Sequence, residues 1–307
     1  MPDYTLITAI GTPLKPDESL HVGGLEAQID DQFAGGITGL LVGGTMGAMQ
    51  LLSDETYEAL IDESIRIARG RGEVLVGVGD ASLARTLARV KLLNTKRADG
   101  AVVLSPYLLR FSQTELIDYY TALADASVHP LYLYDLPVIT GTKLEFETVR
   151  TLSRHPNIRG IKCSGDIGWT RQLIDLNLPD FRVIVAAADM IDVLFRSGIT
   201  EHLDGIFAAA PHWVGQIAQS AMRQDWASAA AAQQKVNALL RLVREFGVLP
   251  TFTAILNARG IPGNYAPRPY RPLDPQRLEA VLASEPVRLL LNGQHAPSPR
   301  PSAMAAR

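Results

Sequence analysis

Short apolar runs alternate with longer amphipathic segments along most of the chain, in a regular order. The apolar runs are mostly continuous rather than alternating in polarity, as in parallel strands that are covered on both faces. We expect eight such strands, over residues 5–10, 39–44, 73–79, 100–106, 130–137, 158–164, 182–188 and 204–210. Because they alternate with helical segments, they predict an α/β protein, and a closed (β/α)8 TIM barrel more naturally than an open sheet.

The segments between the strands have clear helix boundaries. Residues 53–70 begin with Ser53 as a plausible N-cap, carry acidic residues in the first turn, and end in Arg69 and Gly70. Residues 230–247 and 251–260 predict further helices beyond the eight-fold repeat. We therefore expect a barrel over residues 1–225, a C-terminal helical extension over 226–292, and a disordered tail over 293–307, which is rich in Pro, Ser and Ala.

Composition narrows the class of protein. A chain of 307 residues suits one barrel of roughly 250 residues with an appendage. A hydrophobic fraction of 47% and a net charge of −3 indicate a folded protein without the basic surface that attracts nucleic acid or anionic membranes, so we expect neither partner. No apolar stretch has the length of a membrane span, and no signal peptide is apparent, which predicts a cytoplasmic protein. Cys163 is the only cysteine, which excludes an intramolecular disulfide and a cysteine-based metal site.

In a barrel of this kind, active sites lie at the C-terminal ends of the strands, where the loops converge. Lys162 is close to the end of one expected strand, among Ile158 and Ile161. Burial disfavours the charged form of a lysine, and a neutral amine can attack a ketone to form a Schiff base. The alternative is a lysine held by a salt bridge inside the barrel, to Asp166 or Asp189, and the strand alone leaves both open. We place the other lysines in loops or on solvated helix faces: Lys15, Lys91, Lys96, Lys143 and Lys235.

Two other strand ends carry groups that would complement such an amine. Tyr134 has a neutral phenol that could move a proton, although a packing role with a satisfied hydroxyl is the commoner use of a strand tyrosine. The glycine-rich turn that contains Gly44, Thr45 and Met46 could hold a carboxylate through its backbone N–H groups and the Thr45 hydroxyl, or it could simply turn the chain from strand to helix. Together, the amine, the proton carrier and the carboxylate clamp fit chemistry on a 2-oxo acid.

At these positions the chain resembles the dihydrodipicolinate synthase and N-acetylneuraminate lyase family of class I, pyruvate-type aldolases. Three segments carry the resemblance, in the order and separation found in the family: GGTMG with the following LLSDETYEALI, then YDLPVITG, then GIKCSGD. The resemblance covers roughly residues 4–290. It implies that Lys162 forms the Schiff base, that Tyr134 transfers protons, and that Thr45 and Met46 bind the carboxylate. It also implies a homotetramer, with no metal or organic cofactor beyond the covalent imine.

The departures from the family pattern bear on the substrate. Met46 and Ala48 stand where many members have a second threonine and a glutamate. Ile139 stands where dihydrodipicolinate synthases have an arginine that grips the carboxylate of the second substrate, and a hydrophobic side chain cannot do so. Leu108, preceded by Tyr107, stands where those synthases have a tyrosine that enters a neighbouring subunit. An apolar residue at the Ile139 position is closer to the sialic-acid lyases and the 2-keto-3-deoxy sugar acid aldolases or dehydratases.

Several further residues are candidates for binding the rest of the substrate. The substrate-binding set comprises Gly44, Thr45, Met46, Tyr107, Leu108, Ile139, Asp189 and Phe207, beside the catalytic pair Lys162 and Tyr134. Asp192 and His212 are weaker candidates, because surface carboxylates and a helix-capping histidine are common. We expect Cys163 to be structural, because it points to the opposite face of the strand from Lys162.

These observations predict a Schiff-base lyase or aldolase that acts on a 2-oxo acid, with a 2-keto-3-deoxy sugar acid or a related compound as substrate. The same imine would also allow loss of water, so a 2-keto-3-deoxy sugar acid dehydratase is the nearest alternative, and 4-hydroxy-tetrahydrodipicolinate synthase is a further one. A barrel that only binds a 2-oxo acid as a sensor is the alternative outside enzymes. Such a sensor would need neither the tyrosine nor the lysine.

Overall fold

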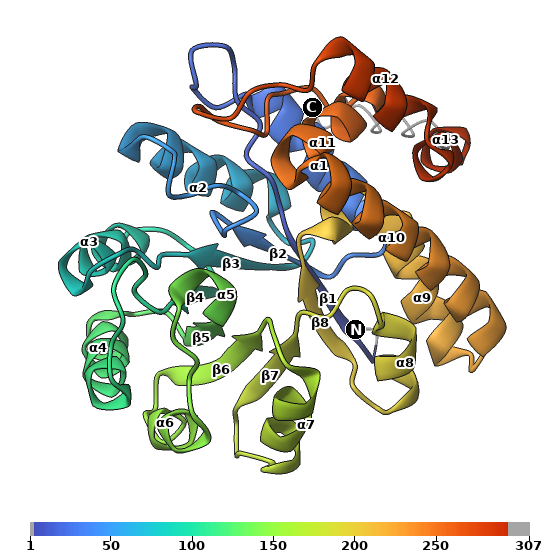
Figure 1. Ribbon diagram of the computed structural model, residues 1–307. Helices are drawn as coiled ribbons and strands as arrows, with labels where there is room; N and C mark the ends of the chain where they lie inside the picture. The colour runs from blue at the N-terminus through green and yellow to red at the C-terminus, as the bar shows by residue number, and fades with distance from the viewer. Residues whose placement is uncertain (1–2, 294–307) are drawn as a thin grey trace, which may run out of the picture.

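In the computed structural model, which describes residues 3–293, eight parallel strands close into a barrel in sequence order (Figure 1). The expected α/β TIM barrel is confirmed. The strands are β1 (Thr5–Ala9), β2 (Gly39–Val42), β3 (Glu73–Gly77), β4 (Gly100–Leu104), β5 (Leu131–Asp135), β6 (Ile158–Cys163), β7 (Arg182–Val185) and β8 (Glu201–Asp204).

Helices surround the strands, and four more follow along one side of the barrel beyond α9 (Figure 1). Those around the strands are α1 (Val22–Ala34), α2 (Asp54–Ala68), α3 (Leu83–Leu93), α4 (Gln113–Ala126), α5 (Pro137–Thr140), α6 (Phe146–Leu152), α7 (Ile167–Asp175), α8 (Ile191–Arg196), the 3₁₀ turn η1 (Ile206–Ala208) and α9 (Pro211–Met222). The four that follow are α10 (Trp226–Phe246), α11 (Val248–Ala258), α12 (Pro275–Ala283) and α13 (Glu285–Asn292). The division at residue 225 stays a prediction, and nearly all of the expected disordered tail, from residue 294 on, lies outside the described residues. Within residues 3–293, we find no helix with the length and hydrophobicity that a membrane crossing requires.

Local sequence explains where the helices begin. The Ser53 side chain accepts a hydrogen bond from the Thr56 N–H at the start of α2, as expected, and this satisfies a backbone donor that the helix leaves unpaired. At the start of α4, Ser112 and Glu115 form a capping box, in which each side chain accepts from the other residue's backbone N–H.

The eighth strand was expected at residues 204–210, and this is wrong. The strand is Glu201–Asp204, and the apolar run after it begins with the 3₁₀ turn Ile206–Ala208, which is fully buried. The apolar run had indicated a strand because buried short helical turns and buried strands have the same local hydrophobicity. Asp204 therefore stands at the C-terminal end of its strand rather than at the beginning.

The register of the strands stacks inward-facing side chains in layers. Tyr134 of β5 pairs with Lys162 of β6, and one layer lower Tyr132 pairs with Gly160, which pairs with Arg182 of β7. The upper layer is nearer the C-terminal ends of the strands, where the loops after the strands converge.

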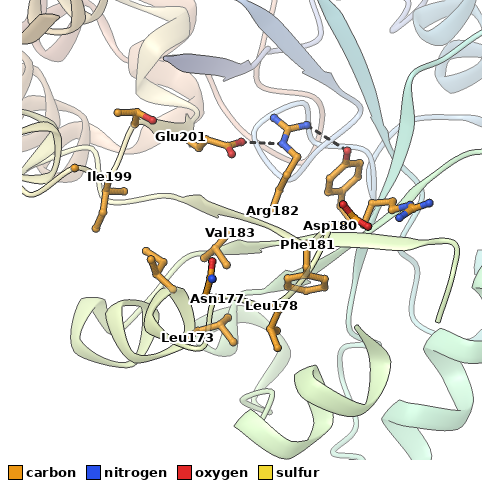
Figure 2. A pocket seen from close by; sticks show the side chains of 14 residues that line it. Leu173, Asn177, Leu178, Asp180, Phe181, Arg182, Val183, Ile199 and Glu201 are labelled. Atoms are coloured by element: carbon orange, nitrogen blue, oxygen red, sulfur yellow. Dashed lines mark hydrogen bonds and ion pairs between the residues drawn. The ribbon is translucent and has the colours of Figure 1, made fainter. Parts of the chain in front are cut away.

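The lower layer contains a network of ion pairs at the N-terminal end of the barrel. The Arg182 guanidinium lies 2.8 Å from carboxylate oxygens of both Glu73 and Glu201, and it donates to the Tyr132 hydroxyl at 3.2 Å. Burial lowers the pKa of Arg182, but the bonds to the two glutamates raise it by more. Figure 2 shows Arg182 and Glu201 in the wall of an open cavity of about 600 Å³ at this end of the barrel.

Candidate active site

Lys162 is a buried lysine without a carboxylate partner. It is the penultimate residue of β6, it is only 4% exposed, and its Nζ lies 4.0 Å from the centre of the Tyr134 ring. Among the residues that the structure describes, no carboxylate oxygen lies within 4.0 Å of this amine. Asp166 instead accepts from the Trp169 N–H at the start of α7, and Asp189 lies 3.8 Å from Arg244. The salt bridges considered as an alternative role for Lys162 are therefore not formed.

Tyr134 lies beside the lysine, and Thr45 lies beside Tyr134. The Tyr134 hydroxyl and the Thr45 hydroxyl are 3.4 Å apart, so either could donate to the other. Tyr134 is almost fully buried, whereas Thr45 is partly exposed. An amine, a phenol and an aliphatic hydroxyl thus come from three different strand ends to one place, as the sequence indicated.

The glycine-rich turn after β2 leaves two backbone donors available. Gly43 has a φ of 61°, a left-handed conformation that favours glycine, and the Ala48 N–H closes the turn on the Thr45 carbonyl at 3.1 Å. In the described part of the chain, the N–H groups of Thr45 and Met46 have no hydrogen-bond acceptor. Such consecutive free donors can bind a carboxylate.

The Met46 side chain has a structural contact that the sequence did not indicate. It packs against the loop after β8, where a Cβ on Gly205 would lie only 2.9 Å from the Met46 Cγ. The turn that could hold a carboxylate is therefore in contact with the end of the eighth strand.

The candidates on the rim of the site differ in exposure. Leu108 is 86% exposed with a φ of 79°, and Ile139, on α5, is 56% exposed. The Tyr107 hydroxyl donates to Asp80 at 3.4 Å, and burial followed by the charge of Asp80 raises the pKa of this tyrosine. Phe207 is fully buried in η1, and its role in substrate binding stays a prediction.

A second cavity, of about 320 Å³, opens between the ends of β6, β7 and β8 and helix α10. Its polar side chains are the expected Asp189 and two residues that the sequence analysis missed, Asp204 and Arg244. Burial raises the pKa of the Asp204 carboxyl, the Ile206 N–H and the charge of Lys162 lower it, and the charge of Asp189 raises it. The missed signal was the short run EHLD, which is the true eighth strand and places Asp204 at the barrel mouth.

Lys143 is not the solvated loop lysine that we expected. Its amine forms an ion pair with the buried Asp135, at the end of β5, and lies 3.2 Å from the centre of the Trp169 ring. Burial raises the pKa of Asp135, and the hydrogen bond from Lys143 lowers it. The pair ties the loop that contains α5 back to the strand. Lys96 is also largely covered, because it pairs with Glu58 and Asp62.

Within residues 3–293, the structure contains neither an exposed thiol nor a group of side chains suited to a metal ion. Cys163 is buried, and burial raises its pKa to about 12, which keeps the thiol protonated and fits a structural residue. Over the described residues, no group of three or more His, Cys, Asp or Glu side chains could hold a metal ion.

Known proteins resemble this chain in sequence, and solved structures resemble it in fold. The chain is 32% identical over 228 residues to 4-hydroxy-tetrahydrodipicolinate synthase of Exiguobacterium sibiricum, which is 74% of this chain and 78% of that one. The crystal structure of the dihydrodipicolinate synthase from Acinetobacter baumannii complexed with pyruvate is 26% identical, with a TM-score of 0.83 over 95% of this chain and 98% of that one. A prophage protein of the dihydrodipicolinic acid synthase family from E. coli K12, also in complex with pyruvate, is 25% identical, with a TM-score of 0.84 over 91% of this chain and 96% of that one.

A model of one protein family also matches this chain. The model of the dihydrodipicolinate synthetase family matches residues 4–284, which is nearly the whole of the described chain. Enzymes of this family act on pyruvate-type substrates through a lysine Schiff base and need no external cofactor. The chain therefore belongs to the dihydrodipicolinate synthetase family and is a class I, pyruvate-dependent aldolase or lyase.

Proposed function

We propose that this enzyme forms a Schiff base between Lys162 and a 2-oxo acid, and that it makes or breaks a carbon–carbon bond to pyruvate in a 2-keto-3-deoxy sugar acid or a related compound. The observation that carries the proposal is the buried Lys162 amine, which has no carboxylate within 4.0 Å in the described chain and lies against Tyr134, whose hydroxyl is 3.4 Å from that of Thr45. A buried lysine with no ion-pair partner is suited to nucleophilic attack.

In the proposed reaction, the N–H groups of Thr45 and Met46 hold the carboxylate of the 2-oxo acid. The Lys162 amine adds to the C2 carbonyl, and water leaves as the imine forms. Tyr134 transfers protons at the carbinolamine, since a proton carrier must lie within hydrogen-bond reach of the atoms that it serves. Loss of a C3 proton gives an enamine, which attacks an aldehyde in synthesis and is the product of cleavage in the reverse direction.

The residues on the rim favour a hydroxylated partner over an anionic one. Ile139 supplies no charge, and two cations of the mouth region already have partners, Lys143 with Asp135 and Arg244 with Asp189. The cavity between the ends of β6, β7 and β8 and helix α10 contains two carboxylates, which would repel a second carboxylate and could accept hydrogen bonds from hydroxyls.

The named relatives favour a second candidate, 4-hydroxy-tetrahydrodipicolinate synthesis, because several relatives at 32–37% identity carry that name. Loss of water from a 3-deoxy sugar acid, through the same imine, is a third. A purely binding role as a sensor is not favoured, because the chain belongs to a family of enzymes.

An activity panel separates these functions. The purified protein is incubated with 2-keto-3-deoxy acids, and pyruvate release and water loss are followed by mass spectrometry; in parallel, it is given pyruvate with aspartate semialdehyde. We expect pyruvate release from a 2-keto-3-deoxy acid to be the fastest reaction. Faster condensation with aspartate semialdehyde would make the synthase the correct function, and faster water loss the dehydratase.

We also propose that the protein assembles as a homo-oligomer, a tetramer by resemblance, in the cytoplasm. Four large apolar side chains are exposed in the loops after the adjacent strands β4 and β5: Leu108, Leu109, Val138 and Ile139. Exposed apolar groups of this size commonly mark an interface. Sedimentation analysis of the native protein and of Leu109→Asp tests this, and a monomeric native protein would contradict it.

A further inference from the structure

The loop after β1 forms a hydrogen bond to the glycine-rich turn that follows β2. Thr12, which is only 2% exposed, donates its side-chain hydroxyl to the Gly47 carbonyl at 2.7 Å. Among residues 3–293, we find no other hydrogen-bond donor to that carbonyl. Gly47 directly follows Thr45 and Met46, whose free backbone N–H groups form the proposed carboxylate site. Thr12 therefore contacts this turn, although the reaction outlined above does not use its hydroxyl.

The peptide unit between Gly47 and Ala48 is held from both sides. Its carbonyl accepts from Thr12, and its N–H, on Ala48, donates to the Thr45 carbonyl at 3.1 Å. Ala48 has a φ of 52°, a left-handed conformation that costs free energy in a residue other than glycine and needs support from its surroundings. The bond from Thr12 thus fixes the peptide unit next to a strained residue, at the point where the turn closes on Thr45.

The loop that contains Thr12 is itself bound to two other parts of the protein. The side-chain amide of Gln28, on α1, accepts from the Gly11 N–H at 2.9 Å and donates to the Gly11 carbonyl at 3.1 Å. Leu14 and Asn264, in the segment after α11, exchange two backbone hydrogen bonds of 2.9 Å each. The Thr12 hydroxyl therefore comes from a loop whose own backbone is fixed on both sides of it.

We propose that Thr12 is a positioning residue, which holds the N–H groups of Thr45 and Met46 in place for the carboxylate of the 2-oxo acid. This inference rests on the Schiff-base function proposed above. Without the hydroxyl, the buried Gly47 carbonyl would lose its partner, and the cost of an unpaired buried carbonyl would favour rearrangement of the turn. Binding through the carboxylate would weaken, whereas the reaction of Lys162 with a ketone that has no carboxylate would not.

The test compares the native protein with Thr12→Val, because valine has nearly the shape of threonine but no hydroxyl. Thr12→Ala also removes the hydroxyl and takes its place if the valine variant does not fold, and Thr12→Ser restores the hydroxyl. The matched control is Thr170→Val on α7, since Thr170 is also 2% exposed and its hydroxyl also donates to a backbone carbonyl, that of Asp166, at 2.9 Å. Urea denaturation shows which variants are folded.

Each folded protein is incubated with cyanoborohydride and either pyruvate or its neutral methyl ester. Mass spectrometry follows the rate of adduct formation over a range of ketone concentrations. For the variants that lack the Thr12 hydroxyl, we expect the half-saturating concentration of pyruvate to rise about tenfold, the effect of one lost hydrogen bond, and the rate with the ester to stay native. Thr12→Ser and Thr170→Val should match the native protein with both ketones.

Three results would overturn the inference. They are a native half-saturating concentration of pyruvate without the Thr12 hydroxyl, an equal loss with pyruvate and with the ester, and a native protein that reacts equally well with both ketones. Failure of the native protein to form any adduct would instead overturn the proposed function itself.

Discussion

Each end of the barrel interior contains a cation, and the surroundings of the two cations differ. At the N-terminal end, Arg182 lies 2.8 Å from carboxylate oxygens of Glu73 and of Glu201. At the C-terminal end, one layer higher, Lys162 has no carboxylate within 4.0 Å among residues 3–293 and lies against the Tyr134 ring. The same kind of inward-facing position thus holds a paired cation in one layer and an unpaired one in the next.

The difference suggests that Arg182 contributes to stability, whereas Lys162 contributes to the reaction. Two carboxylates compensate the desolvation of Arg182, so the guanidinium is fully engaged within the protein. The amine of Lys162 is not engaged by a carboxylate, so it remains able to form a bond to a substrate. We therefore expect matched substitutions at the two ends to affect different measurements.

The largest expected effect is on activity, at the C-terminal end. Lys162→Met should abolish Schiff-base chemistry and lower kcat/KM by several orders of magnitude, because no other group can replace a covalent nucleophile. It should change the free energy of unfolding little, since no ion pair is lost. Steady-state kinetics and urea denaturation check both parts, and an unfolded or much less stable variant would indicate that Lys162 has a structural role instead.

The matching change at the N-terminal end should affect stability. Arg182→Met leaves Glu73 and Glu201 without their cation, and we expect the free energy of unfolding to fall by about 3 kcal/mol, the lower end of the range for buried pairs, because the Arg182 side chain is 29% exposed. The variant should still form the pyruvate adduct. If the variant and the native protein had the same free energy of unfolding in urea denaturation, this account of the lower layer would be contradicted.

The sequence predicts the residues at the C-terminal end of the barrel better than those at the N-terminal end. The reason is the separation in sequence between the residues that interact. The sequence could predict that Lys162, Tyr134 and Thr45 lie together, because each is near the end of a recognisable strand and strand ends converge in a closed barrel. The Arg182 network was not predicted, because Glu73 is 109 residues away in sequence and no local pattern pairs them. Asp204 was missed because the apolar run after it resembled a strand, which placed this residue at the wrong end of the barrel.

The loss of a single hydroxyl from each layer gives a finer comparison. Tyr134→Phe removes the proton carrier while keeping the ring against Lys162, and we expect turnover to fall about 10²- to 10⁴-fold. Tyr132→Phe removes only the hydroxyl that accepts from Arg182 at 3.2 Å, and it should lower stability by about 1 kcal/mol with activity unchanged. Comparable activity losses in both variants would show that the two layers are not functionally distinct.

The last comparison concerns the third cation, Lys143, at the edge of the upper layer. Burial raises the pKa of Asp135 and Lys143 lowers it, so Lys143→Met should raise this pKa further. A carboxyl whose pKa is higher in the folded state binds protons more readily when folded, so stability falls as the pH rises through that pKa. The variant should therefore lose more stability at mildly alkaline than at mildly acidic pH, by urea denaturation. A loss that is the same at both pH values would contradict this assignment.

The most direct test of the account is to find which lysine reacts. The native protein and Lys162→Met are incubated with pyruvate and borohydride, digested, and mapped by mass spectrometry, with longer 2-oxo acids tested in the same way. We predict a reduced adduct on Lys162 alone, in the native protein alone. An adduct on another lysine such as Lys143, or no adduct with any 2-oxo acid, would contradict the claim that the unpaired amine at the barrel mouth is the nucleophile.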